Sequence, residues 1–305
     1  MKTTAGFRNK NSLIRLYFTI NGALAIIILL LIFFFLLKEG CPAISEIGLG
    51  EFLFKTRWMP GSQDPGYGTL ALVLSTLIVA LGAMIISIPW GVIAAGYISD
   101  VAPRKIKEIL KSTVEMLAVF PSVVLGFIAL TTIAPIVART FGLSNGLTAL
   151  TGSIMLSIMA LPTIISISED ALNSVPREYK EAAIALGATR WEVLKKVTYP
   201  SASSGILAAI MLGFGRAIGE TMTVLMATGN SLALPMTDVY GIPFPDFLTS
   251  VRTLTATIAI EGSDVPWGSL HYHSLFVVGA ILFVLTFVIN LVADLAINRF
   301  YGGNS

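Results

Sequence analysis

The chain has 305 residues, of which 55 % are hydrophobic and 12 % are charged. That charged share is about half the share in a typical soluble protein, so a soluble fold could not cover its surface with charge. A formal net charge of +2 gives no basic face for nucleic acid, and the single cysteine, Cys41, excludes an intrachain disulfide and any cysteine-rich metal site. The composition predicts an all-α polytopic membrane protein.

Uncharged stretches long enough to cross a bilayer occur six times along the chain. Their flanking charges are Arg15 and Lys38, Asp64 and Asp100, Glu115 and Arg139, Arg139 and Glu169, Lys196 and Arg216, and Asp264 and Asp294. Pro89 divides the second stretch into a span at about 69–88 and a shorter continuation. Six transmembrane helices place both ends of the chain on one side of the membrane.

Lysine and arginine distinguish the two sides of the membrane. Fourteen of them lie in the N-terminal segment, the second and fourth connections and the C-terminal segment, against five in the other three connections. Both termini are therefore predicted to be cytoplasmic. The first apolar run is longer than a signal-peptide core, and no small-residue cleavage site follows Leu37, so the first helix is expected to stay in the mature protein.

Two external connections are long. The first, about 38–67, contains aromatic residues that are expected at the depth of the lipid headgroups. The other, 229–273, is rich in Pro, Gly and Thr, and its segment 247–260 has apolar residues at near-helical spacing. Two interpretations of that segment stay open: an interfacial or re-entrant helix, and a loop that lies on the protein.

The fourth connection, 169–200, is predicted to be cytoplasmic and contains ten charged residues. Ser174 and Pro176 are typical of a helix start, and Gly187 can close that helix in a left-handed conformation. Thr189 and Glu192 have the spacing of a capping box, which predicts a second short helix. Such an elbow is either a docking platform for another protein or an ordinary helical hairpin on lipid headgroups.

The same connection resembles the EAA coupling motif of ATP-binding-cassette (ABC) importer permeases. Glu181-Ala182-Ala183 is followed at the family's spacing by Gly187 and by Val197-x-Tyr199-Pro200, in which Val and Tyr replace the family's Ile and Leu. In that family the segment is a coupling helix that inserts into a cleft on the ATPase subunit. The resemblance implies that Glu181, Ala182, Ala183, Gly187 and Pro200 couple the chain to an ATPase.

A narrower resemblance covers most of the chain. Segments similar to the permeases of the phosphate-specific importer are Trp58-Met59-Pro60, Gly68-Thr69-Leu70, Phe120-Pro121-Ser122-Val123-Val124-Leu125-Gly126, Val175-Pro176-Arg177-Glu178, Ala185 to Trp191, and Gly215 to Thr221. Val224-Leu225-Met226 with Gly229-Asn230, and Ser269 to Tyr272, resemble the PstC-type permease more than its PstA-type partner.

This resemblance implies a type I ABC importer permease fold in a prokaryotic cytoplasmic (inner) membrane. Residues 1–67 would be the N-terminal tail, first transmembrane helix and external loop, and 301–305 the C-terminal tail. Residues 68–300 would form the permease core, with the coupling segment 169–200 and the external loop 229–273.

The chain has no G-x-x-x-x-G-K-[ST] phosphate loop, so no cofactor is expected on it. The family implies partners instead: two copies of an ABC ATPase that use ATP and Mg²⁺, a PstA-type second permease, an external phosphate-binding protein and a phosphate-signalling regulator. The expected function is half of a phosphate import pathway that works by alternating access. A permease for another oxyanion is the alternative.

Arg216 and Glu220 are the strong charges well inside a predicted span. At a spacing of i and i+4 they would share one helix face and could pair. The first interpretation is an intramembrane ion pair, either a scaffold or a gate. The second is direct contact of the Arg216 guanidinium with an anion, to which Thr221 and Thr223 could add hydroxyl donors.

Gly215-x-x-x-Gly219, in the same helix, is expected to be a site of close helix packing. Two other function classes predict different sequence features. An ion-coupled secondary transporter would show an inverted internal repeat and need no docking elbow. A membrane enzyme is disfavoured because the chain has two histidines, no H-E-x-x-H and no G-x-S-x-G, and no catalytic or metal-ligating residue is predicted.

Overall fold

The computed structural model describes residues 4–239 and 242–301. Within those ranges, five helices are long and apolar enough to cross a membrane, and the number is six if the pair Arg190–Ser201 and Ser203–Gly219, which bends by 71°, forms one span. Five of the six predicted spans are thus confirmed, and the remaining one corresponds to this bent pair. Their helices are α1 (Thr4–Ile47), α3 (Leu70–Gly96), α5 (Ser122–Ile128) with the π-helical turn η2 (Ala129–Ile133) and α6 (Ala134–Phe141), α7 (Ala149–Asn173), α11 (Ser203–Gly219) and α14 (Leu270–Tyr301).

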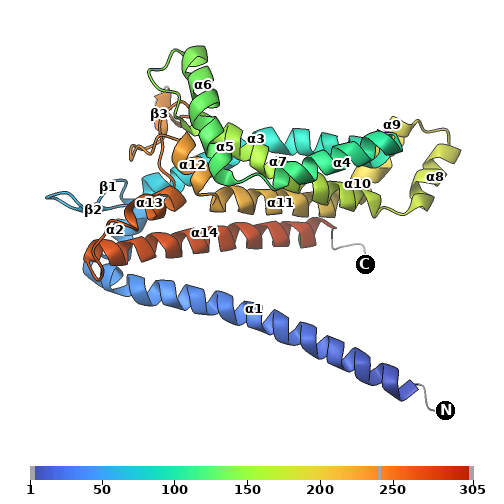
Figure 1. The fold of residues 1–305 in the computed structure, drawn as a ribbon, viewed down its shortest axis with the longest axis horizontal. Coiled ribbons are helices and arrows are strands. Elements are labelled where there is room, and N and C mark those ends of the chain that lie inside the picture. Colours follow the sequence, from blue (N-terminus) through green and yellow to red (C-terminus); the bar gives the residue numbers. More distant parts are fainter. Residues whose placement is uncertain (1–3, 240–241, 302–305) are drawn as a thin grey trace.

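Helices α3, α7, α11 and α14 run side by side, and α1 diverges from them toward its N-terminus (Figure 1). α7 packs against both α3 and α11, and α14 packs against α11 and α1. The centre of the bundle is therefore α7 and α11, and α1 lies at its edge.

Short elements connect the spans. They are α2 (Leu49–Phe54), β1 (Trp58–Met59), β2 (Gly66–Tyr67), η1 (Tyr97–Val101), α4 (Arg104–Ala118), α8 (Arg177–Ala185), α9 (Arg190–Val193), η3 (Leu194–Thr198), α10 (Tyr199–Ser201), α12 (Met222–Ala227), β3 (Met236–Val239), β4 (Ile242–Pro245) and α13 (Leu254–Glu261). β1 pairs antiparallel with β2, and β3 with β4. We term the end of the bundle that carries α8 and α9 the elbow end, and the opposite end, with α13, the loop end (Figure 1).

Small residues let the central helices approach closely. Ile164 of α7 is buried between α3 and α11, where a Cβ on Gly91 would lie 2.7 Å from its side chain and one on Gly213 would lie 2.8 Å from it. The close packing expected at Gly215 and Gly219 is therefore found at Gly213 instead. A Cβ at Gly219 would meet nothing within 4 Å, because that face of the last turn of α11 is exposed.

The segment 247–260, for which a helix and a surface loop were both open, contains α13. Leu254, Ala256 and Thr257 are buried, and the Leu254 N–H donates to Thr76 Oγ1 of α3 at 3.0 Å. The helix thus enters the protein at the loop end and does not lie on its surface.

The first helix is longer than its apolar run. α1 continues through Lys38 and Pro42 to Ile47, so the predicted boundary at Leu37 is wrong. The reason is tertiary packing, because Gly40 lies where a Cβ would be 3.1 Å from the Val277 side chain of α14. The charged residues after Leu37 mark the end of the apolar run, and the helix itself continues beyond them.

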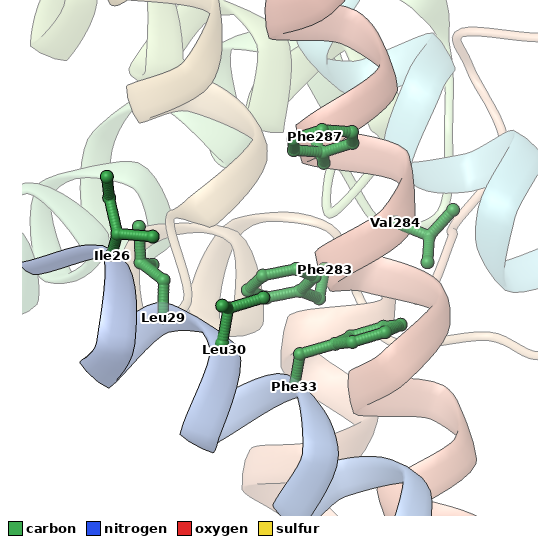
Figure 2. Close-up of a pocket in the computed structure, with 7 residues that line it drawn as sticks. All are labelled: Ile26, Leu29, Leu30, Phe33, Phe283, Val284 and Phe287. Carbon is green, nitrogen blue, oxygen red and sulfur yellow. The ribbon is translucent and has the colours of Figure 1, made fainter. Parts of the chain in front are cut away.

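Beyond this contact α1 diverges from α14 and leaves an open wedge of about 430 Å³, shown in Figure 2. Its lining is Ile26, Leu29, Leu30, Phe33, Phe283, Val284 and Phe287. The rings of Phe33 and Phe283 stack with centroids 5.2 Å apart. Because these side chains are all hydrocarbon, this apolar wedge offers no hydrogen-bond donor to an anion and is not a transport path.

Candidate functional site

The connection between α7 and α11 folds into the predicted elbow. α8 ends in a Schellman motif, in which the Gly187 N–H donates to Ile184 O at 2.9 Å and the next N–H donates to Ala183 O at 3.1 Å. Gly187 has a φ of +88°, in the left-handed region that glycine adopts without a Cβ penalty. Thr189 and Glu192 form a reciprocal capping box that begins α9. Both short helices and the glycine between them are confirmed.

The tip of the elbow exposes apolar side chains. Leu186 is 90 % exposed and Trp191 is 65 % exposed. Of the predicted coupling residues, Glu181 and Ala182 are exposed and Ala183 is half-buried. The small residues of α8 beside the exposed Leu186 give a surface that another protein can approach closely, whereas Trp191 lines a groove with Tyr97 and Tyr199.

Polar contacts join the elbow to the bundle. Lys180 of α8 forms an ion pair with Asp100 of η1, with Nζ 2.6 Å from Oδ1. The Tyr199 hydroxyl donates to the Val92 carbonyl of α3 at 3.0 Å. Pro200, the last predicted coupling residue, is exposed in α10, where the chain turns into α11.

Arg216 lies in the last turn of α11, where a cation interacts favourably with the negative end of the helix. Its Nη1 donates to Thr163 Oγ1 of α7 at 3.2 Å. Its other N–H groups have no hydrogen-bond partner among the described residues. The guanidinium is thus oriented from one side and keeps donors that a ligand can use.

Directly after α11 the helix is interrupted. Glu220 is extended, with φ −71° and ψ 131°, and the Thr255 hydroxyl donates to its carbonyl at 2.9 Å. The carboxylate accepts the Thr223 N–H at 3.2 Å and so caps the start of α12. The buried Thr223 hydroxyl lies 3.1 Å from Ser122 O and 3.3 Å from the same carboxylate.

The prediction that Arg216 and Glu220 share one helix face is wrong, because α11 ends at Gly219. Among the described residues no ion pair joins the two side chains. Thr221 is half-buried at the break, with its hydroxyl 3.5 Å from Gly219 O. The four predicted pathway residues therefore surround one helix break, with Arg216 before it and the other three after it.

A buried carboxylate near the elbow end was not singled out from the sequence. Glu169 of α7 is 2 % exposed and forms ion pairs with Lys107 at 3.1 Å and Lys111 at 2.8 Å, both from α4. Asn173 donates a further hydrogen bond to it at 2.6 Å. The hydrogen bond to Glu169 raises the pKa of Lys111. The sequence does contain a signal for this cluster: Glu169 is an acidic residue at the end of a predicted span, on the same predicted side as the basic second connection.

A second cluster of polar side chains, centred on Glu261, links three segments at the loop end by hydrogen bonds. Glu261 of α13 accepts hydrogen bonds from the Trp58 indole at 3.0 Å and from Arg252 at 2.8 Å. His271, at the start of α14, lies 2.8 Å from the same carboxylate. Among the described residues, no three His, Cys, Asp or Glu side chains are grouped so that they could hold a metal ion.

Comparison with known proteins relates the chain to transport permeases. A family model described as the inner membrane component of binding-protein-dependent transport systems matches residues 87–301. The chain is 37 % identical over 238 residues to a probable ABC transporter permease protein, YqgH, of Bacillus subtilis, covering 78 % of this chain and 74 % of that one. It is 33 % identical over 276 residues to the phosphate transport system permease protein PstC of Mesorhizobium japonicum, covering 84 % and 80 %.

Solved structures share the fold at low identity. A chain of a bacterial ABC transporter for import of the acidic polysaccharide alginate matches with a TM-score of 0.59 at 16 % identity, over 96 % of this chain and 99 % of that one. A chain of the MetNI methionine ABC transporter, in an inward-facing conformation, matches with a TM-score of 0.55 at 19 % identity, over 76 % and 94 %. The predicted type I ABC importer permease fold is confirmed.

Proposed function

Because this chain belongs to the inner membrane components of binding-protein-dependent transport systems, we propose that it is the transmembrane permease subunit of an ATP-driven phosphate importer. Several relatives at 30–33 % identity over most of the chain are named as phosphate transport system permease proteins, which supports phosphate as the substrate. The observation that carries the ATP-driven mechanism is the elbow, whose apolar tip is exposed unless another protein covers it.

The chain forms half of the pathway, and a PstA-type permease completes it. Two ABC ATPase subunits bind and hydrolyse ATP with Mg²⁺, and one of them receives the elbow at Glu181–Gly187 in a surface cleft. When the ATPases close, the elbow moves and the spans reopen outward, where an external binding protein delivers the anion. Contact with a phosphate-signalling regulator stays a prediction from the resemblance.

Arg216 contacts the passing anion in this proposal. A planar guanidinium can direct two parallel N–H donors to two phosphate oxygens, which a lysine cannot do. Thr163 orients the group from one side, and the remaining donors are free for the substrate. Glu220 and Thr223 hold the helix break that leaves Arg216 near the mouth of the pathway, with Thr221 beside it.

The elbow end faces the cytoplasm in this arrangement. The start of α1, the end of α14 and the elbow all lie at that end of the bundle (Figure 1). The basic residues of α4 begin there as well, which agrees with the excess of Lys and Arg on the cytoplasmic side of membrane proteins.

Transport by the reconstituted complex tests the proposal. The chain, its partner permease, the ATPases and the binding protein are placed in lipid vesicles, and uptake of labelled phosphate is followed with ATP on the elbow side. We expect uptake that needs ATP and that continues after ionophores collapse the proton and sodium gradients. Uptake that follows an ion gradient without ATP would establish the secondary-transporter alternative, and uptake of sulfate or molybdate in place of phosphate would correct the substrate.

A further inference from the structure

Three parts of the elbow segment bond to one short stretch of the neighbouring span. The segment runs from Asn173, where α7 ends, to Tyr199, where α10 begins, and its partners lie between Val92 and Asp100 of α3 and η1. At the start of the segment, Ser99 Oγ donates to Asn173 Oδ1 at 3.1 Å. The elbow is therefore attached to one element at its beginning, middle and end.

The middle contact is a partly buried ion pair. The side chains of Lys180 and Asp100 are 20 % and 21 % exposed. The second carboxylate oxygen of Asp100 is buried and has no hydrogen-bond partner among the described residues. Loss of Lys180 would therefore leave a partly buried carboxylate without its ion-pair partner, which is unfavourable.

In the last contact, the ring of Tyr199 packs where α3 has a glycine. A Cβ at Gly96 of α3 would overlap the hydroxyl of Tyr199, so the absence of a side chain there makes room for the ring. The hydroxyl reaches through that space to the Val92 carbonyl. The Val92 carbonyl lies inside α3, so it accepts the Tyr199 hydroxyl in addition to its bond within the helix. This hydrogen bond joins α10 directly to α3.

A π-helical turn lies next to the Tyr199 contact in each of the two segments, although Tyr199, Val92 and Gly96 are themselves in α-helices. η1 covers Tyr97–Val101 at the end of α3, and η3 covers Leu194–Thr198 just before Tyr199. π-helical turns carry an extra residue per turn and often mark functional positions in helices. Each side of the contact therefore has a local irregularity that can take up a change of angle.

α3 continues from this contact to the opposite end of the bundle. Near its start, Thr76 Oγ1 accepts the N–H of Leu254, the first residue of α13. Between the two ends α3 is packed along α7, and Ser153 Oγ donates to Val79 O at 3.1 Å. One continuous helix, which runs through Pro89 and is not divided there, therefore connects the elbow with α13 at the loop end.

We infer that residues 92–101 receive the movement of the elbow, and that the Lys180–Asp100 ion pair and the Tyr199 hydroxyl transmit it to α3. α3 then shifts α13 at the loop end, so that the state of the ATPases reaches the external mouth of the pathway. The inference rests on the proposed function, in which an ATPase moves the elbow. It adds the residues that pass the movement on, which act by positioning α3 and do not touch the substrate.

The test compares phosphate uptake with ATP hydrolysis in the complete complex in vesicles. The variants are Lys180→Met, which keeps the stem and removes the charge, Tyr199→Phe, which keeps the ring and removes the hydroxyl, and the exchange of Asp100→Lys with Lys180→Asp. Arg104→Met is the matched control, since it breaks an exposed ion pair with Glu108 inside α4 that joins no two elements.

We expect Lys180→Met and Tyr199→Phe to lower the phosphate imported per ATP hydrolysed by about threefold to thirtyfold, the range typical of residues that carry coupling between sites. ATP hydrolysis continues in both variants, the charge exchange restores most of the ratio, and Arg104→Met does not change it. A wild-type ratio in both single variants would overturn the inference. An exchange variant as defective as Lys180→Met would do so too, because the pair would then serve the fold alone.

A second readout separates this inference from the proposed function. If the wild-type complex hydrolyses ATP but imports no phosphate, the proposed function is wrong, and hydrogen exchange at residues 97–101 then decides the inference. A change in protection on ATP binding that occurs in the wild-type chain and is lost in Lys180→Met supports it. The same change in both chains contradicts it.

Discussion

The guanidinium of Arg216 donates one hydrogen bond, to Thr163, and its other N–H groups have no partner among the described residues. An isolated charge inside a bilayer costs several kcal/mol, so it has to face protein or water. The end of α11 supplies part of the compensation through its negative helix terminus, and Thr163 supplies one hydrogen bond. The other N–H groups of Arg216 are the donors that the proposed function assigns to the anion.

Substitution of Arg216 tests this at the level of one side chain. We expect Arg216→Gln to reduce phosphate uptake by roughly tenfold to a hundredfold, because a hydrogen bond to a charged group contributes about 1.5–3 kcal/mol. Arg216→Lys keeps the charge but loses the planar fork, so it recovers part of the loss. The measurement is initial uptake in complexes shown to be fully assembled.

The control for Arg216 is Arg139→Gln, because Arg139 is also a lone arginine in the last turn of a helix, α6, and is exposed. Uptake by that variant should match the wild type. Wild-type rates for both Arg216 variants would end the idea that this residue contacts the substrate.

The sequence singles out Arg216 and Glu220, but the arrangement of the two side chains could not be predicted from it. Arg216 and Glu220 stand out because charges are rare inside a span. The end of α11 between them depends on Thr255, which bonds to the Glu220 carbonyl from 35 residues further along the chain. Spacing along a helix cannot reveal a helix end that a distant segment stabilises.

Among the elements, the elbow followed its sequence signals most closely. Gly187 and the Thr189–Glu192 box act within a few residues of one another, so local spacing was enough to predict two helices and the turn between them. By contrast, the extension of α1 to Ile47 and the burial of α13 depend on contacts with α14 and α3. Elements that distant packing defines were therefore misplaced or left open.

Gly187→Val tests the elbow as an element. Valine strongly disfavours a φ of +88°, so the Schellman turn must open and shift α9 relative to α8. No neighbouring atom lies within 4 Å of the added Cβ, so the effect comes from the backbone and not from a clash. We expect loss of ATPase docking, or ATP hydrolysis that no longer drives uptake, measured by co-purification and by phosphate imported per ATP.

Two matched variants serve as controls for Gly187→Val. Gly187→Asn should keep most of the coupling, because asparagine tolerates the left-handed region. Gly142→Val places the same strain, at a φ of +66°, after α6 at the loop end. It should destabilise the chain similarly and leave the coupling ratio unchanged, and an equal loss of coupling in both valine variants would count against the elbow.

For the whole molecule, the two ends of the bundle carry different elements. The elbow, the α4 lysines and both outer ends of α1 and α14 gather at one end, and the Trp58–Glu261 cluster lies at the other. The number of spans and the charge bias are properties of the entire chain, so the sequence predicted this polarity. The packing order of the helices, with α7 at the centre, was not predictable from it, because membrane helices of similar apolarity give no signal for their neighbours.

Labelling of single cysteines tests the orientation. In a Cys41→Ser background, Arg104→Cys at the elbow end and Trp267→Cys at the loop end introduce exposed thiols, since Arg104 is 93 % and Trp267 is 89 % exposed. A membrane-impermeant maleimide added to intact cells should label position 267 and spare 104. Inside-out vesicles should give the reverse pattern, and the opposite result in either preparation would invert the proposed topology.

The pairing of α1 with α14 joins the first and last helices of the sequence through Phe33 and Phe283. Between Ile47 and Leu270 the ribosome must add 222 residues, roughly 10–45 s of synthesis at about 5–20 residues per second. During that interval α1 is without its packing partner, and the two helices can pair only after α14 has been synthesised. A nascent chain cut short before α14 would therefore present an orphaned hydrophobic helix to the quality-control proteases of the membrane.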